Sequence, residues 1–506
     1  MITDRCSQEL DQYCFDHETT ERNLIETHIS RVILTGPFAY KIKKPVDLGF
    51  VNYTCLEQRK RFCDLELELN RRFAPELYLD VVPVFEHENR LLVGAEFGEK
   101  LELSGKIIDY AVKMRQFPQN SIAANCLSSL TSTNIEDFGW RLARFHDGIE
   151  SAIPTAEFAQ PTKIVSQTIE NFEVLADAFT RDWRSDAVEQ LCSWSQSACD
   201  QLKPNFIQRL NAGRVKQCHG DLHLKNLILR NDRLIPFDGI EFNEQFRFVD
   251  VLCEIAFPVM DFFARGKSMF AWRLLNAYLE ESGEYDDLAL LRFYLVYRAM
   301  VRAKVAWLNP NNHTKERFEQ YTNQDFPDDL VAGPWDKYLK TAYYFAFELS
   351  PQLTITHGFS GSGKSTLAMQ RIEKTGGIRI RSDVLRSRLA RKFNIKEKYS
   401  GEMNNWIYSH MAGLCRDGLI AGFPIIADAT FLEAERRANF RELATSVGTK
   451  FNILDCQASY DVLVQRILNR SNDASEANIE VLENQMKNHD PLSNSEKVES
   501  HAASMT

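Results

Sequence analysis

Eight residues near position 360 constrain the fold of this chain more tightly than any other stretch. Residues 358–365 read GFSGSGKS, which has the form G-x-x-x-x-G-K-[ST]. A short β-type run, residues 353–356, precedes them, and a helical pattern follows. Glycines let backbone N–H groups converge on a phosphate, and a helix N-terminus adds a favourable dipole. The stretch therefore predicts a phosphate-binding loop in an α/β domain with a parallel sheet.

Two side chains of this loop have separate expected roles. Lys364 is expected to reach the β- and γ-phosphates of ATP, and Ser365 to hold Mg²⁺. The candidate nucleotide-binding residues of the loop are Gly358, Ser360, Gly361, Ser362, Gly363, Lys364, Ser365 and Thr366.

Acidic and basic residues farther along the chain are candidates for handling the acceptor. Asp383 follows the strand-like residues 378–381, and an acid at the carboxyl end of a parallel strand is placed to meet an acceptor as general base. Arg386 is a candidate for binding the acceptor or the γ-phosphate. Asp428 ends a buried-strand pattern and either positions Mg²⁺ or the acceptor, or caps a helix. Arg466 and Arg470, one helical turn apart, are either lid arginines over the phosphates or part of a solvated helix face.

A second candidate centre lies in the first two-thirds of the chain. Residues 219–226 read HGDLHLKN, so an aspartate, Asp221, is followed five residues later by Asn226. This is the spacing of a kinase catalytic loop, and Asp238, after a predicted hairpin at 227–237, fits the metal-binding aspartate that follows such a loop. We expect Asp221 to accept the hydroxyl proton, and Asn226 and Asp238 to ligate Mg²⁺. The alternative is an Asx-rich turn between two strands.

A kinase also needs a lysine on the donor phosphates, and two candidates share one strand. Lys41 and Lys43 point to the same face of the strand predicted at 38–44, because side chains alternate with period two. Alternation does not distinguish them; Lys41 is favoured because it follows an apolar stretch. For either lysine alone, the alternative is a solvated residue at the edge of the strand. Glu66 lies on the apolar stripe of the helix predicted to begin with a cap at Thr54, and a buried carboxylate needs a cationic partner. A strand lysine would supply that partner.

Residue patterns also predict the other helices and strands of the first two-thirds of the chain. Residues 133–349 are expected to be mostly helical around the catalytic stretch, and residues 109–117 to form a strand leading into a hinge. Further strands are expected at 28–34, 38–44, 79–85 and 91–95, the first two being joined by a turn at 35–37.

Composition narrows the class of protein. The chain has 506 residues, 44% hydrophobic and 26% charged, which is typical of a globular protein with two or three domains. Eleven cysteines are odd in number and scattered, so they are expected to be free thiols in a reducing cytoplasm. No signal peptide or membrane span is expected, and a net charge of −10 does not favour broad nucleic-acid binding. Composition says nothing of oligomeric state.

Residues 1–349 resemble the aminoglycoside phosphotransferase-like kinases. The shared pattern is H-G-D-x-x-x-x-N, here 219–226, followed by an aspartate in an F-D-x-x-E context, here residues 237–241. An arginine-to-aspartate segment, 247–250, resembles the family's structural support for the catalytic loop. The resemblance implies a bilobal α+β protein-kinase-like fold and ATP-dependent phosphorylation of a small-molecule hydroxyl group.

Residues 352–495 resemble P-loop kinases related to polynucleotide kinase and zeta toxin. Asp383 and Arg386 match that group's Asp-x-x-Arg, Asp428 its strand acid, and Arg466 and Arg470 its lid arginines. No AAA-type sensor or oligomerisation region is recognisable, so a motor ATPase is disfavoured. The two halves together resemble a group of bacterial two-kinase proteins.

These observations predict a multi-domain cytoplasmic protein with two ATP- and Mg²⁺-dependent kinase centres that act on hydroxyl groups of small molecules. One alternative makes the P-loop half a 5′-hydroxyl nucleic-acid kinase; another makes one half a nucleotide-sensing regulator of the other. The expected division is a kinase-like domain at 1–349, with an N-lobe at about 1–115 and a helical C-lobe at about 116–349, a P-loop domain at 350–495 and a disordered tail at 496–506. The identity of either acceptor is beyond the sequence.

Overall fold

The protein divides into two compact units. The structure is a computed structural model, and it describes residues 10–49, 51–100, 107–178, 183–309, 333–395, 400–469 and 478–503. The first unit comprises Met1–Asn134, Ile149–Ala159 and Gly213–Glu254, and the second comprises Ile135–Gly148, Gln160–Ala212 and Ile255–Thr506. The domain boundary expected near residue 350 falls inside the second unit and stays a prediction. Among the described residues, we find no helix with the length and apolar character that a membrane crossing requires.

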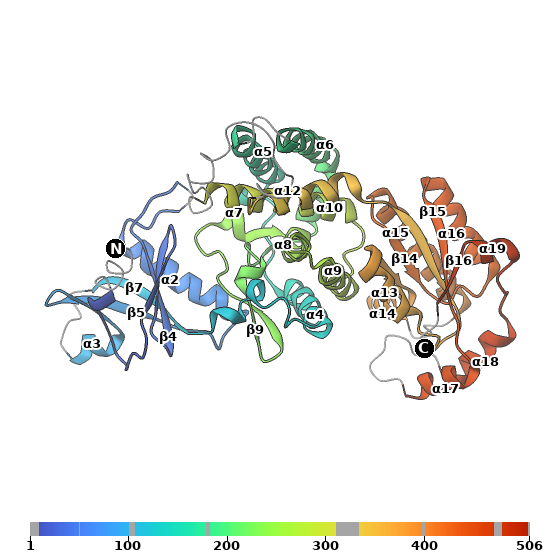
Figure 1. Ribbon diagram of the computed structural model, residues 1–506, viewed down its shortest axis with the longest axis horizontal. Coiled ribbons are helices and arrows are strands. Elements are labelled where there is room, and N and C mark those ends of the chain that lie inside the picture. The colour runs from blue at the N-terminus through green and yellow to red at the C-terminus, as the bar shows by residue number, and fades with distance from the viewer. Residues whose placement is uncertain are drawn as a thin grey trace, which may run out of the picture. The chain divides into compact units, whose positions relative to one another are not determined.

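A twisted sheet forms much of the first unit. Within the described residues its seven strands have the order β1-β6-β5-β7-β4-β3-β2 (Figure 1). β1 and β6 pair in parallel, and the other neighbours are antiparallel. The strands are β1 (Tyr13–Phe15), β2 (Asn23–Glu26), β3 (Ser30–Leu34), β4 (Phe38–Lys43), β5 (Tyr78–His87), β6 (Arg90–Val93) and β7 (Ile107–Arg115).

The expected hairpin between β3 and β4 is confirmed. Thr35 N–H donates to Phe38 O at 2.9 Å, which closes the turn. Gly36 has φ +95°, a left-handed conformation that a side chain would strain.

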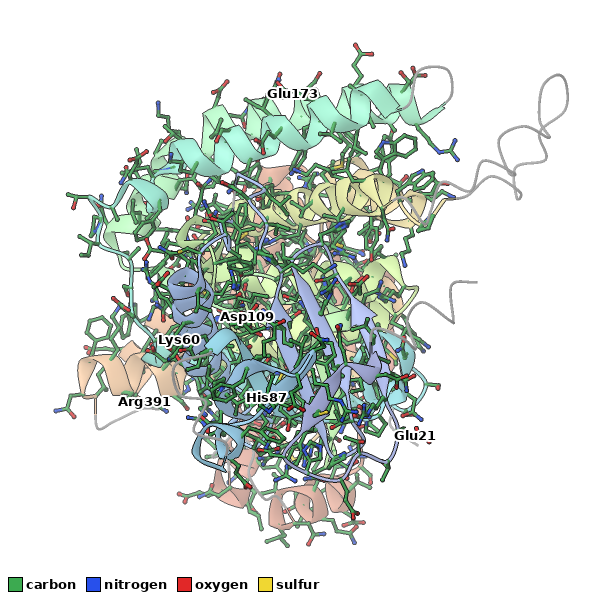
Figure 2. The ribbon with its side chains drawn as sticks, turned by 90° about the vertical axis from the view of Figure 1, so that its left-hand side faces the viewer. Glu21, Lys60, His87, Asp109, Glu173 and Arg391 are labelled. Carbon is green, nitrogen blue, oxygen red and sulfur yellow. The ribbon has the colours of Figure 1, made fainter. Side chains whose placement is uncertain are left out.

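Helix α2 (Leu56–Arg71) packs against this sheet, and its start differs from the expected one. Its N-cap is Cys55, without a side-chain cap, so the expected cap at Thr54 is wrong. Thr54 is occupied elsewhere, since its hydroxyl donates to Asn52 Oδ1 at 2.7 Å. Arg59 on α2 donates to Asp109 on β7 at 2.8 Å, and this bond ties the helix to the strand. Figure 2 labels Asp109 on β7 and Lys60 on α2.

Short elements of the first unit build the predicted catalytic stretch. β8 and β11 pair antiparallel, as do β9 and β10, which form the expected hairpin before Asp238. Helix α8 is buried on nearly every side, as its apolar sequence requires. The elements are β8 (Val215–Gln217), β9 (Leu227–Arg230), β10 (Arg233–Pro236), α7 (Glu244–Arg247) and β11 (Phe248–Asp250), with a 3₁₀ turn at Leu224–Asn226. Helix α8 (Val251–Ala264) begins in the first unit and belongs to the second from Ile255 onwards. A further helix of the first unit is α3 (Ala95–Lys100).

The second unit begins with helices, as the sequence predicts for this part of the chain. Their apolar faces are buried, among them Leu274, Leu275 and Phe293. The helices are α4 (Ser132–Gly148), α5 (Pro161–Ala178), α6 (Trp183–Asn211), α9 (Ser268–Ser282), α10 (Leu288–Leu308) and α12 (Asp336–Tyr343). A π-helical turn, Tyr344–Glu348, follows α12.

A parallel sheet completes the second unit, and this part of the fold class is confirmed. Its five strands among the described residues have the order β13-β14-β12-β15-β16, and every neighbouring pair is parallel (Figure 1). The strands are β12 (Gln352–His357), β13 (Ile378–Arg381), β14 (Ile425–Asp428), β15 (Lys450–Cys456) and β16 (Ser500–Ala503). The helices are α13 (Lys364–Thr375), α14 (Ser382–Phe393), α15 (Gly401–Ile420), α16 (Ala434–Val447), α17 (Tyr460–Leu468), α18 (Ile479–Lys487) and α19 (Asn494–Val498).

The disordered tail expected at 496–506 is wrong for residues 496–503. β16 pairs in parallel with β15, and Ser493 and Glu496 form a capping box at the start of α19. Buried Arg437 donates to Glu496 Oε1 at 2.7 Å and anchors this helix. Polar composition suggested disorder, but the charged group that orders the segment comes from 59 residues earlier in the chain.

Candidate active sites

The catalytic-loop residues of the first unit lie together. Asn226 Nδ2 donates to Asp221 Oδ2 at 3.1 Å and to Asp221 O at 2.9 Å. Asn226 is buried, whereas the Asp221 side chain is 37% exposed. A buried amide thus orients an accessible carboxylate, as a residue that meets an incoming hydroxyl group requires.

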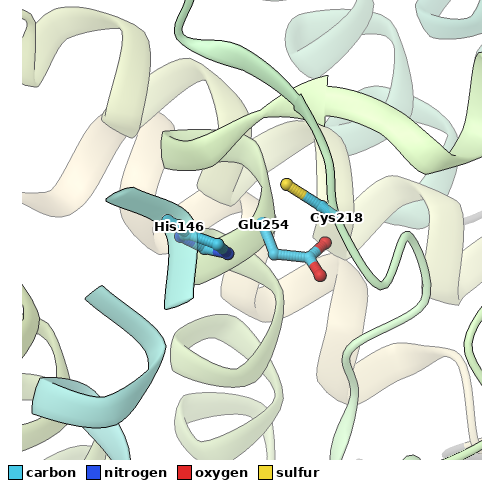
Figure 3. Close-up of side chains that lie close together, drawn as sticks. All are labelled: His146, Cys218 and Glu254. Carbon is cyan, nitrogen blue, oxygen red and sulfur yellow. The ribbon is translucent and has the colours of Figure 1, made fainter. Parts of the chain in front are cut away.

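The backbone just before Asp221 is fixed by a residue that the sequence interpretation missed. Glu254 accepts from the N–H groups of His219 at 2.8 Å and Gly220 at 3.2 Å. Figure 3 shows Glu254 reaching from α8 towards the chain segment that carries Cys218. Gly220 has φ +87°, and a Cβ there would lie 2.5 Å from Phe246 O. Only glycine fits this position.

Asp238 lies where the hairpin returns to the catalytic loop. Phe237 N–H donates to Asn226 O at 3.0 Å, which brings the two predicted metal ligands onto adjoining segments. Asp238 has φ +63°, and its N–H donates to the Tyr78 hydroxyl at 2.9 Å. The Asp238 side chain is 47% exposed, so its carboxylate remains accessible to an ion.

His219 supports the same segment as a neutral ring. Its Nε2 lies 2.9 Å from Phe237 O, and a carbonyl only accepts, so Nε2 carries the hydrogen. Burial lowers the pKa of His219, although Glu254 opposes that effect. These contacts give His219 a structural role.

The structure separates the two candidate lysines on β4. Lys41 Nζ donates to Glu66 Oε1 at 2.8 Å and to Asp238 Oδ1 at 2.5 Å. Lys43 Nζ donates to Glu66 Oε2 at 2.7 Å and also contacts Glu241. The Lys43 side chain has no exposed area, whereas that of Lys41 is 12% exposed and contacts the more open Asp238. Lys41 therefore borders the accessible part of the site, and Lys43 is enclosed.

Glu66 is the charge that holds both lysines, as its place on the apolar stripe predicts. Burial by itself would raise the pKa of Glu66, but Lys41 and Lys43 outweigh burial and lower it to about 2. Burial likewise disfavours the charged lysines, yet their carboxylate partners hold both lysine pKa values well above the ordinary value. All three groups are ionised at neutral pH.

Two more residues of this site had no sequence signal. Asn70 Nδ2 donates to Glu66 O at 2.9 Å, while Asn70 Oδ1 accepts from Gly239 N–H at 2.8 Å. The Tyr53 hydroxyl donates to Glu241 Oε1 at 2.7 Å. Glu241 is buried and paired with Tyr53 and Lys43.

The glycines of the loop at 358–365 have conformations that side chains disfavour. Gly358, Gly361 and Gly363 have φ of +141°, +86° and +87°. A Cβ on Gly358 would lie 2.4 Å from Cys456 O, and one on Gly361 would lie 2.9 Å from Leu463 O. Helix α13 begins at Lys364, directly after the loop, so its first N–H groups point out of the helix start. The loop has the form of a phosphate cradle.

Polar side chains of the loop are placed around this cradle. Lys364 Nζ donates to Phe359 O at 2.8 Å, and Ser362 is buried with no hydrogen-bond partner for Oγ among the described residues. Ser365 is half-buried and Thr366 exposed at the first turn of α13. Ser360 exchanges two hydrogen bonds with Gln485 on α18, at 2.9 and 3.0 Å, a partner that the sequence did not reveal.

Asp428 fits a magnesium site next to the loop. It is the last residue of β14, not a helix cap, and it is buried. Its Oδ1 lies 3.4 Å from Thr356 Oγ1, while Oδ2 has no hydrogen-bond partner among the described residues. Arg381 Nε is 3.7 Å from that oxygen. A buried carboxylate oxygen and a serine hydroxyl are ligands of the kind that Mg²⁺ takes.

The structure describes three of the other four predicted residues of this centre. Asp383 is the second residue of α14 and half-buried, and Arg386 follows it one turn later and is buried. Arg466 on α17 donates to Gly361 O at 3.4 Å, which brings its guanidinium to the loop. Arg470 lies outside the described residues. His357 and Asp455, at the ends of β12 and β15, form a 2.7 Å pair beside Gly358 that the sequence interpretation missed.

One family model matches the C-terminal part of the chain, and one relative matches nearly all of it. The family model AAA_33, described as an AAA domain, matches residues 353–492. The uncharacterized protein Rv2004c of Mycobacterium tuberculosis is 27% identical over 498 residues, 93% of this chain and 91% of that protein.

Two solved structures are each similar to part of the chain. A thermostable mutant of aminoglycoside phosphotransferase APH(4)-Ia covers 65% of this chain and 95% of its own, with 12% identity and a TM-score of 0.38. A gluconokinase from Sinorhizobium meliloti 1021 covers 30% of this chain and 81% of its own, with 19% identity and a TM-score of 0.24.

The class of protein follows from the two sites and from the match of residues 353–492 to the AAA domain model. A kinase-like catalytic loop and a P-loop domain occur on one chain, as the two resemblances predicted. Together they support an ATP-dependent phosphotransferase.

Proposed function

We propose that this protein is a cytoplasmic, Mg²⁺-dependent phosphotransferase with two separate centres, one within 1–349 and one within 350–495, each acting on a hydroxyl group of a small molecule. The observation that carries the first centre is the contact of Lys41 with both Glu66 and Asp238, which lies beside the Asp221–Asn226 pair. The second rests on the glycine loop at 358–365 and the open carboxylate oxygen of Asp428.

In the first centre, Lys41 is proposed to hold the donor phosphates while Glu66 fixes its position. Asp221 accepts the proton of the acceptor hydroxyl, and Asn226 keeps that carboxylate oriented. Asn226 and Asp238 would hold Mg²⁺, which when bound neutralises charge on the phosphates. The Lys41 ammonium has three N–H donors, of which two serve Glu66 and Asp238, and the third is proposed to donate to a phosphate oxygen.

In the second centre, backbone N–H groups at the start of α13 and Lys364 are proposed to bind the donor phosphates. Ser365 and Asp428 would hold Mg²⁺ there. Asp383 is the proposed general base for the acceptor, and Arg386 orients the acceptor or the γ-phosphate. Arg466, already at Gly361, adds positive charge over the loop, and Arg470 is proposed to join it.

The two-centre proposal is tested by ATP turnover of Asp221→Ala, Lys364→Ala and the double variant. A metabolite library and a 5′-hydroxyl oligonucleotide serve as acceptors. Each single change is expected to abolish phosphorylation of one acceptor set and to spare the other. If neither change lowers turnover, the proposal is wrong. If only one does, the other half is regulatory, and transfer to the oligonucleotide would favour a nucleic-acid kinase in the P-loop half.

A further inference from the structure

Helix α9, which precedes the P-loop domain in the chain, places a buried acid against that domain. Glu280 accepts from Arg379 Nε at 2.8 Å, and Arg379 Nη2 lies 2.6 Å from the same oxygen. Arg381 Nη1 lies 3.5 Å from Glu280 Oε2. Both arginines belong to β13, and all three side chains are largely buried. One carboxylate thus balances two guanidiniums away from bulk water.

Each of these arginines also reaches a residue of the proposed magnesium site. Arg379 Nη1 donates to Ser365 O at 2.6 Å. Arg381 Nε lies 3.7 Å from Asp428 Oδ2, the oxygen without a hydrogen bond among the described residues. Glu280 is therefore connected through one arginine to each proposed ligand.

The contact between α9 and the P-loop domain is built from backbone as well as side chains. Asn276 Oδ1 accepts from Arg379 N–H at 2.6 Å, and Asn276 Nδ2 donates to Gly377 O at 3.0 Å. Arg388 on α14 donates to Glu280 O at 3.0 Å and to Ser282 O at 2.7 Å at the end of α9. Figure 1 shows α9 beside α13 and α14. These bonds hold Glu280 at a fixed place relative to β13.

We infer that Glu280 is a positioning residue for the P-loop centre, supplied from outside the residues that the AAA domain model matches. It keeps Arg379 on the Ser365 carbonyl and draws Arg381 away from full contact with Asp428. An Arg381–Asp428 ion pair would compete with Mg²⁺ for the same carboxylate, because both are cations that seek it. The inference rests on the proposed function of the P-loop centre.

Glu280→Gln tests this role, because it removes the charge and keeps the shape. Arg381 then retains Asp428 as an acidic partner and is expected to close the 3.7 Å gap. The apparent affinity of the P-loop centre for Mg²⁺ is expected to fall about tenfold, the order of one close ion pair at partial burial. Binding of metal-free ADP is expected to change little.

The measurements separate the two centres of the full-length protein. Turnover is followed against Mg²⁺ concentration in the Asp221→Ala background. Calorimetry measures the affinities for MgADP and for metal-free ADP. Only the binding that Lys364→Ala abolishes is assigned to the P-loop centre, and the two affinities are compared for that binding. The matched control is Glu281→Gln, since the neighbouring Glu281 forms an exposed pair with Arg144, 2.8 Å away, and is expected to leave both measurements unchanged.

A second variant keeps the inference testable if Glu280→Gln does not fold. Arg381→Gln, alone or combined with Glu280→Gln, is expected to restore or strengthen MgADP binding, because the competing cation is gone. The inference is overturned if the Glu280→Gln variant binds MgADP with the affinity of the unmodified protein, or if its affinity for metal-free ADP falls as much as its affinity for MgADP. It is also overturned if Arg381→Gln lowers the affinity for MgADP. By contrast, if Lys364→Ala removes neither turnover nor nucleotide binding, the proposed P-loop function itself fails.

Discussion

Lys41 on β4 donates to Glu66 on α2 across 2.8 Å, and this bond joins the sheet of the first unit to its helix. Lys43, two residues further along the strand, donates to the other oxygen of the same carboxylate. Because Glu66 is fully buried, its negative charge, shared by both lysines, compensates them together with Asp238 at Lys41 and Glu241 at Lys43. The pair is therefore a structural requirement as well as a proposed part of the phosphate site.

Glu66→Gln is expected to destabilise the protein by about 3–5 kcal/mol at pH 7, the usual cost of breaking a buried ion pair. In this variant Lys41 and Lys43 would remain charged but would lose the carboxylate that they share. Urea unfolding, followed by fluorescence, measures the loss. A change below about 1 kcal/mol would show that the lysines find other partners and that Glu66 does not fix them.

The same carboxylate predicts an acid dependence of stability. The pKa of Glu66 falls from its ordinary value of 4.5 to about 2 on folding, so the folded state binds protons less readily than the unfolded state. Its contribution, about 3 kcal/mol, is complete above about pH 4.5 and is lost as the pH falls towards 2. The difference in unfolding free energy between the unmodified protein and Glu66→Gln is expected to shrink over that range. A constant difference would contradict the assigned pKa.

The proposed catalytic residues could be selected from the sequence because each sits in a short contiguous pattern. Asp221 and Asn226 are five residues apart, and the loop at 358–365 is a single motif. Glu66 was predictable because a carboxylate on an apolar helical stripe needs a partner. A sequence motif predicts a site when the residues of that site, and the backbone that sets their geometry, come from one stretch of chain.

The supporting residues could not be predicted because their partners lie far away in sequence. Tyr78 accepts from Asp238 N–H across 160 positions, and Glu280 meets Arg379 across 99. A tyrosine in a strand or a glutamate near a helix end has no local feature that indicates such a role. The order of the C-terminal residues was missed for the same reason, since Arg437 supplies it from a distance.

Tyr78→Phe is expected to lower turnover at the Asp221 centre several-fold and to spare the Lys364 centre. The change removes the acceptor of the Asp238 N–H group and leaves that group without this bond, at a cost of about 1–3 kcal/mol. Asp238 has positive φ and depends on such bonds for its orientation. The acceptor-specific assays of the two centres measure the effect. Equal losses at both centres would indicate a general loss of folded protein.

Gly220→Ala and Gly413→Ala are expected to have opposite effects on stability. A Cβ at Gly220 would meet Phe246 O at 2.5 Å with φ +87°, so loss of several kcal/mol and of Asp221 turnover is expected. Gly413 lies inside α15 with nothing within 4 Å of an added Cβ, and alanine there should stabilise the helix by about 0.5–1 kcal/mol. Thermal unfolding compares the two. Stabilisation by Gly220→Ala would exclude the close contact.

Comparison of Glu496→Ala with Glu433→Ala distinguishes the stability contributed by a buried ion pair from that contributed by an exposed one. The two pairs involve neighbouring arginines. Arg437 is fully buried and donates to Glu496 and to Phe431 O, whereas Arg436 pairs with the exposed Glu433 at 2.8 Å. Losing Glu496 leaves a buried guanidinium without its carboxylate, so about 3–5 kcal/mol of stability should be lost. Losing Glu433 should cost less than about 1 kcal/mol. Hydrogen exchange of the β16 amides should accelerate in Glu496→Ala only, because α19 anchors that strand; equal exchange in both variants would show that β16 is held by its pairing with β15 alone.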